Sequence, residues 1–381
     1  MARRAAALSL TVVAALSWAG SAAAFPPERR FEFAERTPNQ YLIIPAVASL
    51  PGIGVFAGVI LSASNVGGTG IELGGTYAES IDSTDIKVRA LALREVPLLP
   101  SRMLTLEYQV ADIKLGNFQN YVPGRNSPNF TIPVTGQLQF QLLRPTLNLF
   151  ARRLKASYNL GFVNGFEFDE DGNELTTARH SSGFQVSLDL TDSEVNPKQG
   201  VFAAFSTSLD APEVTIFGRN SIPLPVRRAD LGLVQRRYTL SGYYPLRDDL
   251  TLAGSLQYFR TLGAEGRDEV ISGGSPPLRG YPGGRWRDRF GVFLGGELRY
   301  ALPYNDTIDI VLARGFVEEF QIVGFYEVGQ VSPSENHLLF EDLHHSFGAG
   351  VRVAFDVIVL RFDLGLSDEG GESHLTIDQP F

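Results

Sequence analysis

The 381-residue sequence contains no cysteine. No disulfide can therefore constrain the fold, and the chain has neither thiolate metal ligands nor a cysteine nucleophile. Positive charge is scarce relative to negative charge, because 33 lysines and arginines stand against 42 aspartates and glutamates, a net charge of −9. Nucleic-acid binding needs a basic surface, so we expect no nucleic-acid partner.

Long apolar runs are also missing. After the N-terminal region, no stretch approaches the ~20 apolar residues that a membrane-spanning helix needs. At the start, Arg3 and Arg4 precede a short apolar run that ends at Ala22–Ala24. This pattern predicts a secretory signal peptide over residues 1–24, because a single spanning helix would need a longer run. Residues 25–40 would then be a short periplasmic N-terminal segment.

In place of long apolar runs, the chain shows a persistent alternation of apolar and polar residues. Clear examples lie at 104–110, 184–191 and 358–364. A period of two puts the apolar side chains on one face of a β-strand and the polar ones on the other. Strands this long, with aromatic residues such as Tyr108 and Tyr300 near their ends, are typical of an outer-membrane barrel. A lipocalin-like fold or a soluble sandwich is the alternative.

The alternation predicts an all-β fold: a transmembrane antiparallel β-barrel of about sixteen strands over residues 41–381, an even number as bacterial single-chain barrels have. The predicted strands are 41–47, 53–63, 69–79, 84–96, 101–113, 131–145, 148–163, 181–192, 199–210, 228–243, 249–262, 290–302, 318–331, 344–355, 356–367 and 373–381. Tight turns alternate with long loops, as expected for the periplasmic and outer sides. The predicted long loops are 114–130, 164–180, 211–227, 263–289 and 332–343.

One of these loops is dense in glycine and proline and carries Leu278, Arg279, Gly280 and Tyr281 at its centre. Such a loop cannot be helix or central strand, because glycine is entropically costly there and proline lacks a backbone donor. An arginine in this loop, beside strands that carry inward acidic residues, predicts a loop folded back into the barrel.

The two acidic residues follow from the alternation itself. On strand 290–302, Leu294 and Leu298 share the apolar face, so Glu297 points inward. On strand 318–331, Ile322 and Tyr326 face lipid, so Glu327 also points inward. Both carboxylates are therefore candidate partners for the Arg279 guanidinium, and such charge-assisted bonds are strong when screened from water. The alternative is an exposed Arg279, with both glutamates as ordinary lumenal charges.

Several motifs occur in a characteristic order. A turn, DSEVNPKQGVF at 192–202, precedes the LRGY loop, which is followed by strands reading GVFLGGELRYALP and FQIVGFYEVGQV, and the chain ends on Phe381. This set resembles the BamA/TamA superfamily, also called bacterial surface antigens. The resemblance is strongest from about residue 181 to the end, and it rests on strand number and alternation over residues 40–165.

The resemblance implies roles for individual residues. The loop tip would lie in the barrel lumen, with Arg279 paired to acids on the inner wall. Gly280 would allow close backbone approach, and Tyr281 would pack against the wall. Phe381 would be the C-terminal signal by which the outer-membrane assembly machinery recognises the barrel, which would then contact lipid and lipopolysaccharide.

The resemblance also implies a function, with one departure. Members of this group insert or move polypeptides or lipids through a weak seam between the first and last strands, and assembly factors among them carry periplasmic POTRA domains. Residues 25–40 are too short for a POTRA domain, so we expect any client recognition to come from a separate periplasmic partner protein. The alternative function is a passive narrow pore or a structural surface antigen.

Enzymatic signatures are weak. The sequence has no Gly-x-Ser-x-Gly elbow and no His-x-x-Glu-His site. His180-Ser181 is a chance pairing of residue types that an esterase could use, and the acidic stretch 169–174 lacks calcium-loop spacing. His344-His345, close to Asp342, fits a polar strand end as well as a metal pair. We therefore expect no enzymatic activity, no metal and no cofactor.

Overall fold

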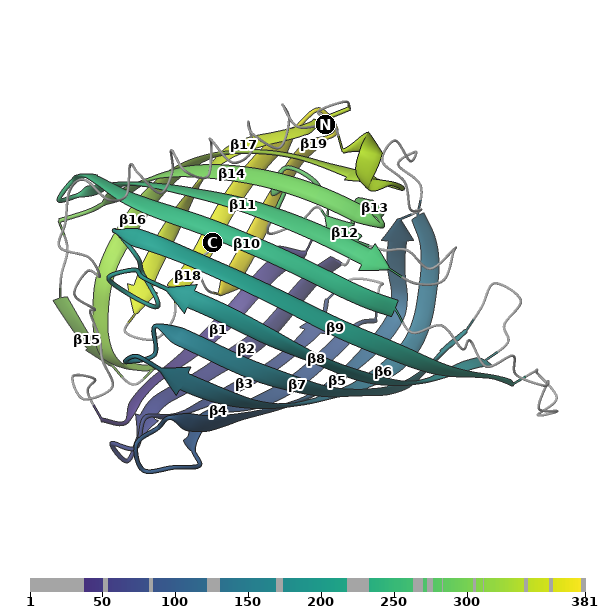
Figure 1. The fold of residues 1–381 in the computed structure, drawn as a ribbon, viewed down its shortest axis with the longest axis horizontal. Coiled ribbons are helices and arrows are strands. Elements are labelled where there is room, and N and C mark those ends of the chain that lie inside the picture. Colours follow the sequence, from purple (N-terminus) through teal and green to yellow (C-terminus); the bar gives the residue numbers. More distant parts are fainter. Residues whose placement is uncertain are drawn as a thin grey trace.

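The fold is taken from a computed structural model of the chain (Figure 1). The structure describes residues 38–50, 54–81, 85–121, 131–168, 174–217, 233–262, 270–272, 277–282, 284–303, 306–310, 312–338, 342–355 and 359–377. The predicted signal peptide, most of the predicted 25–40 segment and Phe381 lie outside these residues. Within them, no helix is long and apolar enough to cross a membrane.

The described chain is almost entirely β-strand. Its elements are β1 (Gln40–Leu50), β2 (Gly54–Val66), β3 (Ile71–Ser80), β4 (Lys87–Pro97), β5 (Leu104–Tyr121), β6 (Thr131–Leu149), β7 (Leu154–Phe168), β8 (Glu174–Asp189), β9 (Gly200–Phe217), β10 (Leu233–Arg247), β11 (Leu250–Leu262), β12 (Val270–Ser272), β13 (Trp286–Asp288), β14 (Phe290–Ala301), β15 (Asp306–Ile310), β16 (Ala313–Ser332), β17 (His344–Phe355), β18 (Val359–Ser367) and β19 (Gly370–Ile377), with a 3₁₀ turn at Glu335–His337.

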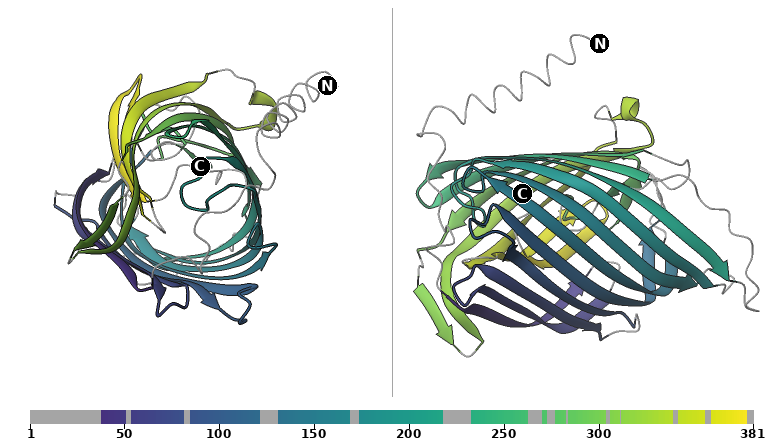
Figure 2. Two further views of the ribbon diagram at one scale, coloured as in Figure 1. Left: turned by 90° about the vertical axis from the view of Figure 1, so that its left-hand side faces the viewer. Right: turned by 60° about the horizontal axis from the view of Figure 1, so that its bottom comes forward.

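These strands form one antiparallel sheet that curls into a barrel-shaped wall (Figure 2, left). Sixteen strands follow one another around the wall, namely β1 to β11, β14 and β16 to β19. Among the described residues, β15 pairs only with residues 313–317 of β16. These residues lie at the end of the barrel where the predicted tight turns lie, which we call the lower end. The prediction of an all-β antiparallel barrel of about sixteen strands is confirmed. β1 and β19 lie beside one another, but no ladder joins these two strands across the described residues.

The two faces of the wall differ as the alternation predicts. Large apolar side chains stand exposed on the outer face, where lipid would cover them. Examples are Leu91, which is 64% exposed, and Tyr326, which is 52% exposed. The opposite face of the same strands carries polar groups that are shielded inside the wall, among them Glu297 and Glu327, each 1% exposed.

The predicted long loops 114–130, 164–180 and 211–227 are partly wrong. β5 continues to Tyr121, β7 to Phe168 and β9 to Phe217, and β8 begins at Glu174, before its predicted start at 181. β5 has 18 residues, whereas about 9–11 suffice to cross a membrane. The additional residues include polar groups on the outer face, for example Lys114, whose Nζ lies 2.5 Å from Asp85 Oδ2. Above the membrane this face needs no apolar side chains, so the sequence there has the composition of a loop.

Candidate functional site: the lumenal arginine loop

The LRGY loop lies against the inner face of the C-terminal strands. The short strands β12 and β13 pair with each other at the base of the loop. Between them, Leu278 and Tyr281 are buried with Trp286 of β13, Phe293 of β14 and Val331 of β16 in one apolar cluster. The apolar side chains of the loop thus fix it to the wall, and this attachment positions the arginine between them.

Arg279 is fully buried and is surrounded by three carboxylates from three different strands. Its Nε donates to Glu327 Oε1 on β16 at 2.7 Å. Its Nη1 lies 2.9 Å from Glu297 Oε1 on β14 and 2.9 Å from Asp363 Oδ2 on β18. The guanidinium also lies over the ring of Phe325, 3.5 Å from the ring centroid. Burial alone would lower the pKa of Arg279, but the three carboxylates outweigh burial and raise the pKa above its ordinary value.

The backbone of Arg279 is bound as well. Its N–H donates to Glu327 Oε2 at 2.7 Å, and its carbonyl oxygen accepts from His374 Nε2 on β19 at 2.7 Å. Ser346 Oγ on β17 donates to the same Glu327 oxygen at 2.7 Å. The loop tip therefore bridges the inner faces of five strands, from β14 to β19.

Glu297 is shared between the loop and two arginines of the wall. Arg299 Nε lies 2.8 Å from Glu297 Oε2, and Arg352 of β17 bonds to the other oxygen. Such a network is stable only if each buried charge has a partner, because an isolated buried charge is costly. The network therefore makes the docked position of the loop energetically specific.

Gly280 sits where no larger residue fits. A Cβ at this position would lie 2.5 Å from the carbonyl oxygen of Leu366 and 2.9 Å from Ser346 Cβ. On the facing strand, a Cβ at Gly365 would lie 2.2 Å from the carbonyl oxygen of Arg279. Two glycines thus let the loop backbone lie directly on β18.

The outer part of the loop binds the turn between β18 and β19. Tyr281 Oη donates to Asp368 Oδ1 at 2.6 Å. Arg285 makes a bidentate pair with Glu369, at 2.7 Å and 2.6 Å. Trp286 stacks on His344 with ring centroids 3.6 Å apart. These contacts bind the loop to the β18–β19 turn and to β17, in addition to the contacts of Arg279.

The DSEVNPKQGVF turn lies at the opposite end of the wall and reaches the same strand β16. Asp192 Oδ1 accepts from the N–H groups of Lys198 and Gln199 at 2.9 and 3.1 Å, which closes the turn. Asn196 is fully buried, donates to Glu319 Oε1 at 3.2 Å and accepts from Gln321 Nε2 at 3.0 Å. β9 and β16 are separated by three strands in the sheet, so the turn crosses the lower mouth of the barrel.

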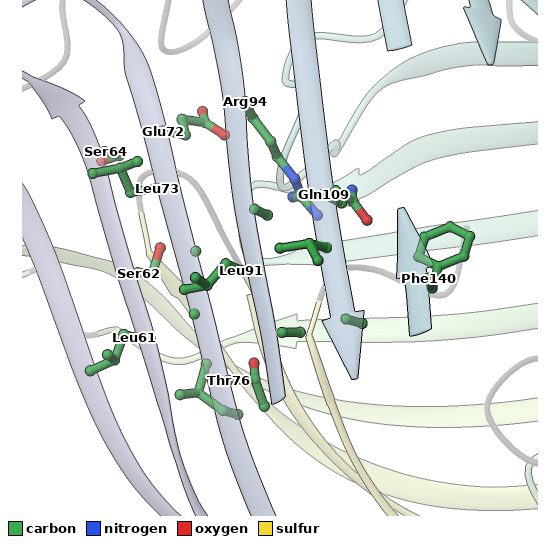
Figure 3. Close-up of a pocket in the computed structure, with 17 residues that line it drawn as sticks. Leu61, Ser62, Ser64, Glu72, Leu73, Thr76, Leu91, Arg94, Gln109 and Phe140 are labelled. Atoms are coloured by element: carbon green, nitrogen blue, oxygen red, sulfur yellow. The ribbon is translucent and has the colours of Figure 1, made fainter. Parts of the chain in front are cut away.

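The opposite part of the inner wall is filled less completely. Beside β2 to β6, a hollow of about 280 Å³ has the small side chains of Ala90, Ala92 and Ala111 in its lining, together with Glu72 and Arg94 (Figure 3). The loop therefore lies against the C-terminal strands, whereas the lining of this hollow beside β2 to β6 combines small and charged side chains.

Within the described part of the chain, the histidine candidates are not brought together with suitable partners. His180 and Ser181 are consecutive residues of β8, so their side chains lie on opposite faces. His344 stacks on Trp286, whereas His345 Nδ1 bonds to Tyr326 Oη at 2.6 Å on the outer face. The described residues contain no cluster of three or more metal-ligating side chains. The acidic stretch 169–174 lies outside the described residues except Glu174.

Asp363 is the partner of Arg279 that the sequence prediction missed. It lies on β18, where Leu360, Phe362 and Leu364 form the apolar face, so the same alternation that selected Glu297 and Glu327 also places Asp363 inward. His374 on β19 is reached by the same argument. Asn196 carries no such signal, because it lies in a turn.

The geometry defines a class of protein: an antiparallel sixteen-strand wall with a loop held inside it by a buried arginine. Residues 76–375 match the model of the Omp85 superfamily domain. The chain belongs to the Omp85 superfamily, whose members are outer-membrane proteins.

Solved structures show the same fold. BamA from Haemophilus ducreyi lacking POTRA domains 1–3 is 14% identical with a TM-score of 0.52, over 89% of this chain and 68% of that one. CdiB from Escherichia coli is 15% identical (TM-score 0.55, 89% and 61% covered), and CdiB from Acinetobacter baumannii is 13% identical (TM-score 0.55, 89% and 59% covered). The chain thus spans about three fifths of the length of the two CdiB chains. A search of curated protein sequences found no match.

Proposed function

We propose that the chain assists the insertion or passage of polypeptides or lipids at the outer membrane, through the seam between β1 and β19, with the lumen obstructed by the LRGY loop. The observation that carries this proposal is the combination of a docked loop with an unpaired seam. Arg279 is held by three buried carboxylates, and across the described residues no ladder joins β1 to β19.

The two features support each other physically. A loop bound by a buried ion network hinders free diffusion through the lumen, so the proposal disfavours a passive pore. An unpaired strand edge is a template for an incoming extended chain, because its N–H and C=O groups need partners. In lipid each unpaired backbone group costs free energy, so a substrate strand or a lipid would be stabilised most where it contacts the open seam.

The proposal includes localisation and partners. The signal peptide over residues 1–24 would direct the chain to the periplasm, and the outer-membrane assembly machinery would insert it with the help of Phe381. A separate periplasmic partner protein would deliver the client. No cofactor, metal or catalytic residue takes part.

Depletion of the protein in its own cells tests the proposal. We expect the abundance of a subset of other outer-membrane barrels, or of outer-leaflet lipid, to fall. A plasmid copy with Arg279→Ala should restore this abundance less well than a copy with Gly296→Ala. Gly296→Ala is the matched control, because an added Cβ there meets nothing within 4 Å. Unchanged outer-membrane protein and lipid after full depletion would overturn the proposal and favour a structural surface antigen.

A further inference from the structure

The first residues of β16, at the mouth of the barrel that the DSEVNPKQGVF turn crosses, form a hairpin with β15 that projects past the wall. Asp306–Ile310 of β15 pairs with residues 313–317 of β16. The wall strand β14 ends at Ala301, and β17 reaches β16 only up to the pair of Val317 with Phe355. The hairpin therefore continues beyond both neighbours of β16, as Figure 1 shows at its lower left.

This hairpin reaches the first strand of the barrel. Tyr41 and Leu42 of β1 are the ladder partners of Arg314 and Ala313. The N–H of Ile43 donates to the carbonyl oxygen of Leu312 at 2.7 Å. Three strands (β17, β18 and β19) separate β16 from the seam, so the hairpin passes beneath the seam and binds its far margin.

Among the described residues, few other backbone bonds hold the seam edge of β1. Along a strand, the N–H groups of residues two apart point to the same edge. The N–H of Ile43 points to the hairpin, so residue 45 presents the same edge, and that residue is Pro45, which has no N–H. The opposite edge of β1 is fully occupied, because β1 pairs with β2 from Gln40 to Leu50. Among the described residues, the pairing at 41–43 is the backbone ladder on the seam edge of β1.

β16 is well anchored above the hairpin. Glu319 and Gln321 bind Asn196 of the lower turn, and Glu327 binds Arg279. A strand fixed at two points holds its own end in place, so the hairpin can hold β1 against the rest of the barrel.

We propose that the β15–β16 hairpin is a latch on the seam: it keeps β1 beside β19, and the seam opens when the pairing at residues 41–43 is broken. The use of this opening by a substrate rests on the function proposed above, whereas the latch is a property of the barrel itself and is tested without substrate.

A disulfide can fix the latch. Because Ile43 is hydrogen-bonded to Leu312, the neighbouring pair of Leu42 and Ala313 is a non-hydrogen-bonded pair, with Cα atoms about 4.5 Å apart, within the disulfide range. The sequence contains no cysteine, so Leu42→Cys/Ala313→Cys gives one defined bond. The matched control is Ile43→Cys/Leu61→Cys, the non-hydrogen-bonded pair that joins β1 to β2 and leaves the hairpin free.

Hydrogen exchange of the purified full-length protein in nanodiscs measures the seam. We expect oxidation of the 42/313 pair to slow exchange in β1 and β19, and oxidation of the control pair to leave β19 unchanged. Ile43→Pro removes the donor to Leu312 and restricts the backbone of residues 42 and 43, so we expect exchange in β1 and β19 to rise by at least the roughly 2- to 10-fold effect of losing one backbone hydrogen bond. β5, on the far wall, should not change.

Equal exchange of β19 in the oxidised and reduced 42/313 protein would overturn the latch, as would failure of that disulfide to form when the control disulfide does. This comparison uses one folded protein and does not depend on the proline variant. A working latch with no effect of depletion on the outer membrane would leave the latch standing and overturn the proposed function.

Discussion

Arg279 donates its backbone N–H and its Nε–H to the two carboxylate oxygens of Glu327, each at 2.7 Å. One glutamate on β16 therefore fixes both the path of the loop backbone and the direction of its central side chain. The same strand binds the lower turn through Glu319 and pairs with β1 at its lower end. β16 thus connects the loop, the lower mouth and the seam.

Replacing Arg279 should be costly. In Arg279→Ala, the carboxylates of Glu297, Glu327 and Asp363 stay buried without their shared cation, and breaking a buried pair costs about 3–5 kcal/mol. Arg279→Lys should be intermediate, because an ammonium cannot reach several carboxylates with the geometry of a guanidinium. Denaturant unfolding of the detergent-solubilised barrel measures both. Equal stability of wild type and Arg279→Ala would contradict the buried network.

Gly280→Ala should displace the loop tip, because the new Cβ would lie 2.5 Å from the carbonyl oxygen of Leu366. Limited proteolysis on the outer side should then cleave the loop faster than in wild type. Gly296→Ala is the matched control, since a Cβ there meets nothing within 4 Å. Identical cleavage of the two variants would show that the loop does not lie against β18.

Tyr281→Phe should weaken the outer anchorage of the loop without releasing Arg279. The change removes the 2.6 Å hydrogen bond to Asp368, and a hydrogen bond to a charged group contributes about 1.5–3 kcal/mol. Tyr158→Phe, at a 48% exposed position on β7, is the control. In Tyr281→Phe, hydrogen exchange should rise in residues 277–289 and stay unchanged in β7, whereas Tyr158→Phe should leave exchange in residues 277–289 unchanged. No rise in the loop of Tyr281→Phe would argue against the Asp368 contact.

Asn196→Ala should loosen the lower mouth. The substitution leaves Glu319 and Gln321 without the amide that lies between them, and an unsatisfied buried group costs about 1–3 kcal/mol. The exposed Asn164 of β7 provides the control Asn164→Ala. A lower unfolding midpoint for the first variant alone is expected, whereas equal midpoints would place the turn outside the mouth.

Period-two alternation is a local property of each strand, and it was sufficient to place Glu297 and Glu327 on the inner face. It carries the same signal for Asp363 on β18, but alternation gives only the face of each side chain and not which inward residues of different strands meet. Strand ends above the membrane could not be located, because their outer face is polar and the alternation is lost.

The contacts of the β15–β16 hairpin and of the lower turn could not be predicted from the sequence for another reason. The partner of Ala313 is Leu42, far away in the sequence, and nothing in the composition of residues 306–317 selects β1. Asn196 likewise meets Glu319 only because the barrel brings β9 and β16 to one mouth. Long-range pairing of this kind is a property of the whole barrel topology rather than of any one segment.

Single-channel conductance of the purified protein in planar bilayers tests the central claim, a lumen obstructed by the Arg279 loop, most directly. We predict small or no currents for wild type and for Gly296→Ala, and clearly larger currents for Arg279→Ala, because release of the loop opens the lumen. Similar small currents in wild type and Arg279→Ala, or large currents in wild type, would contradict the account.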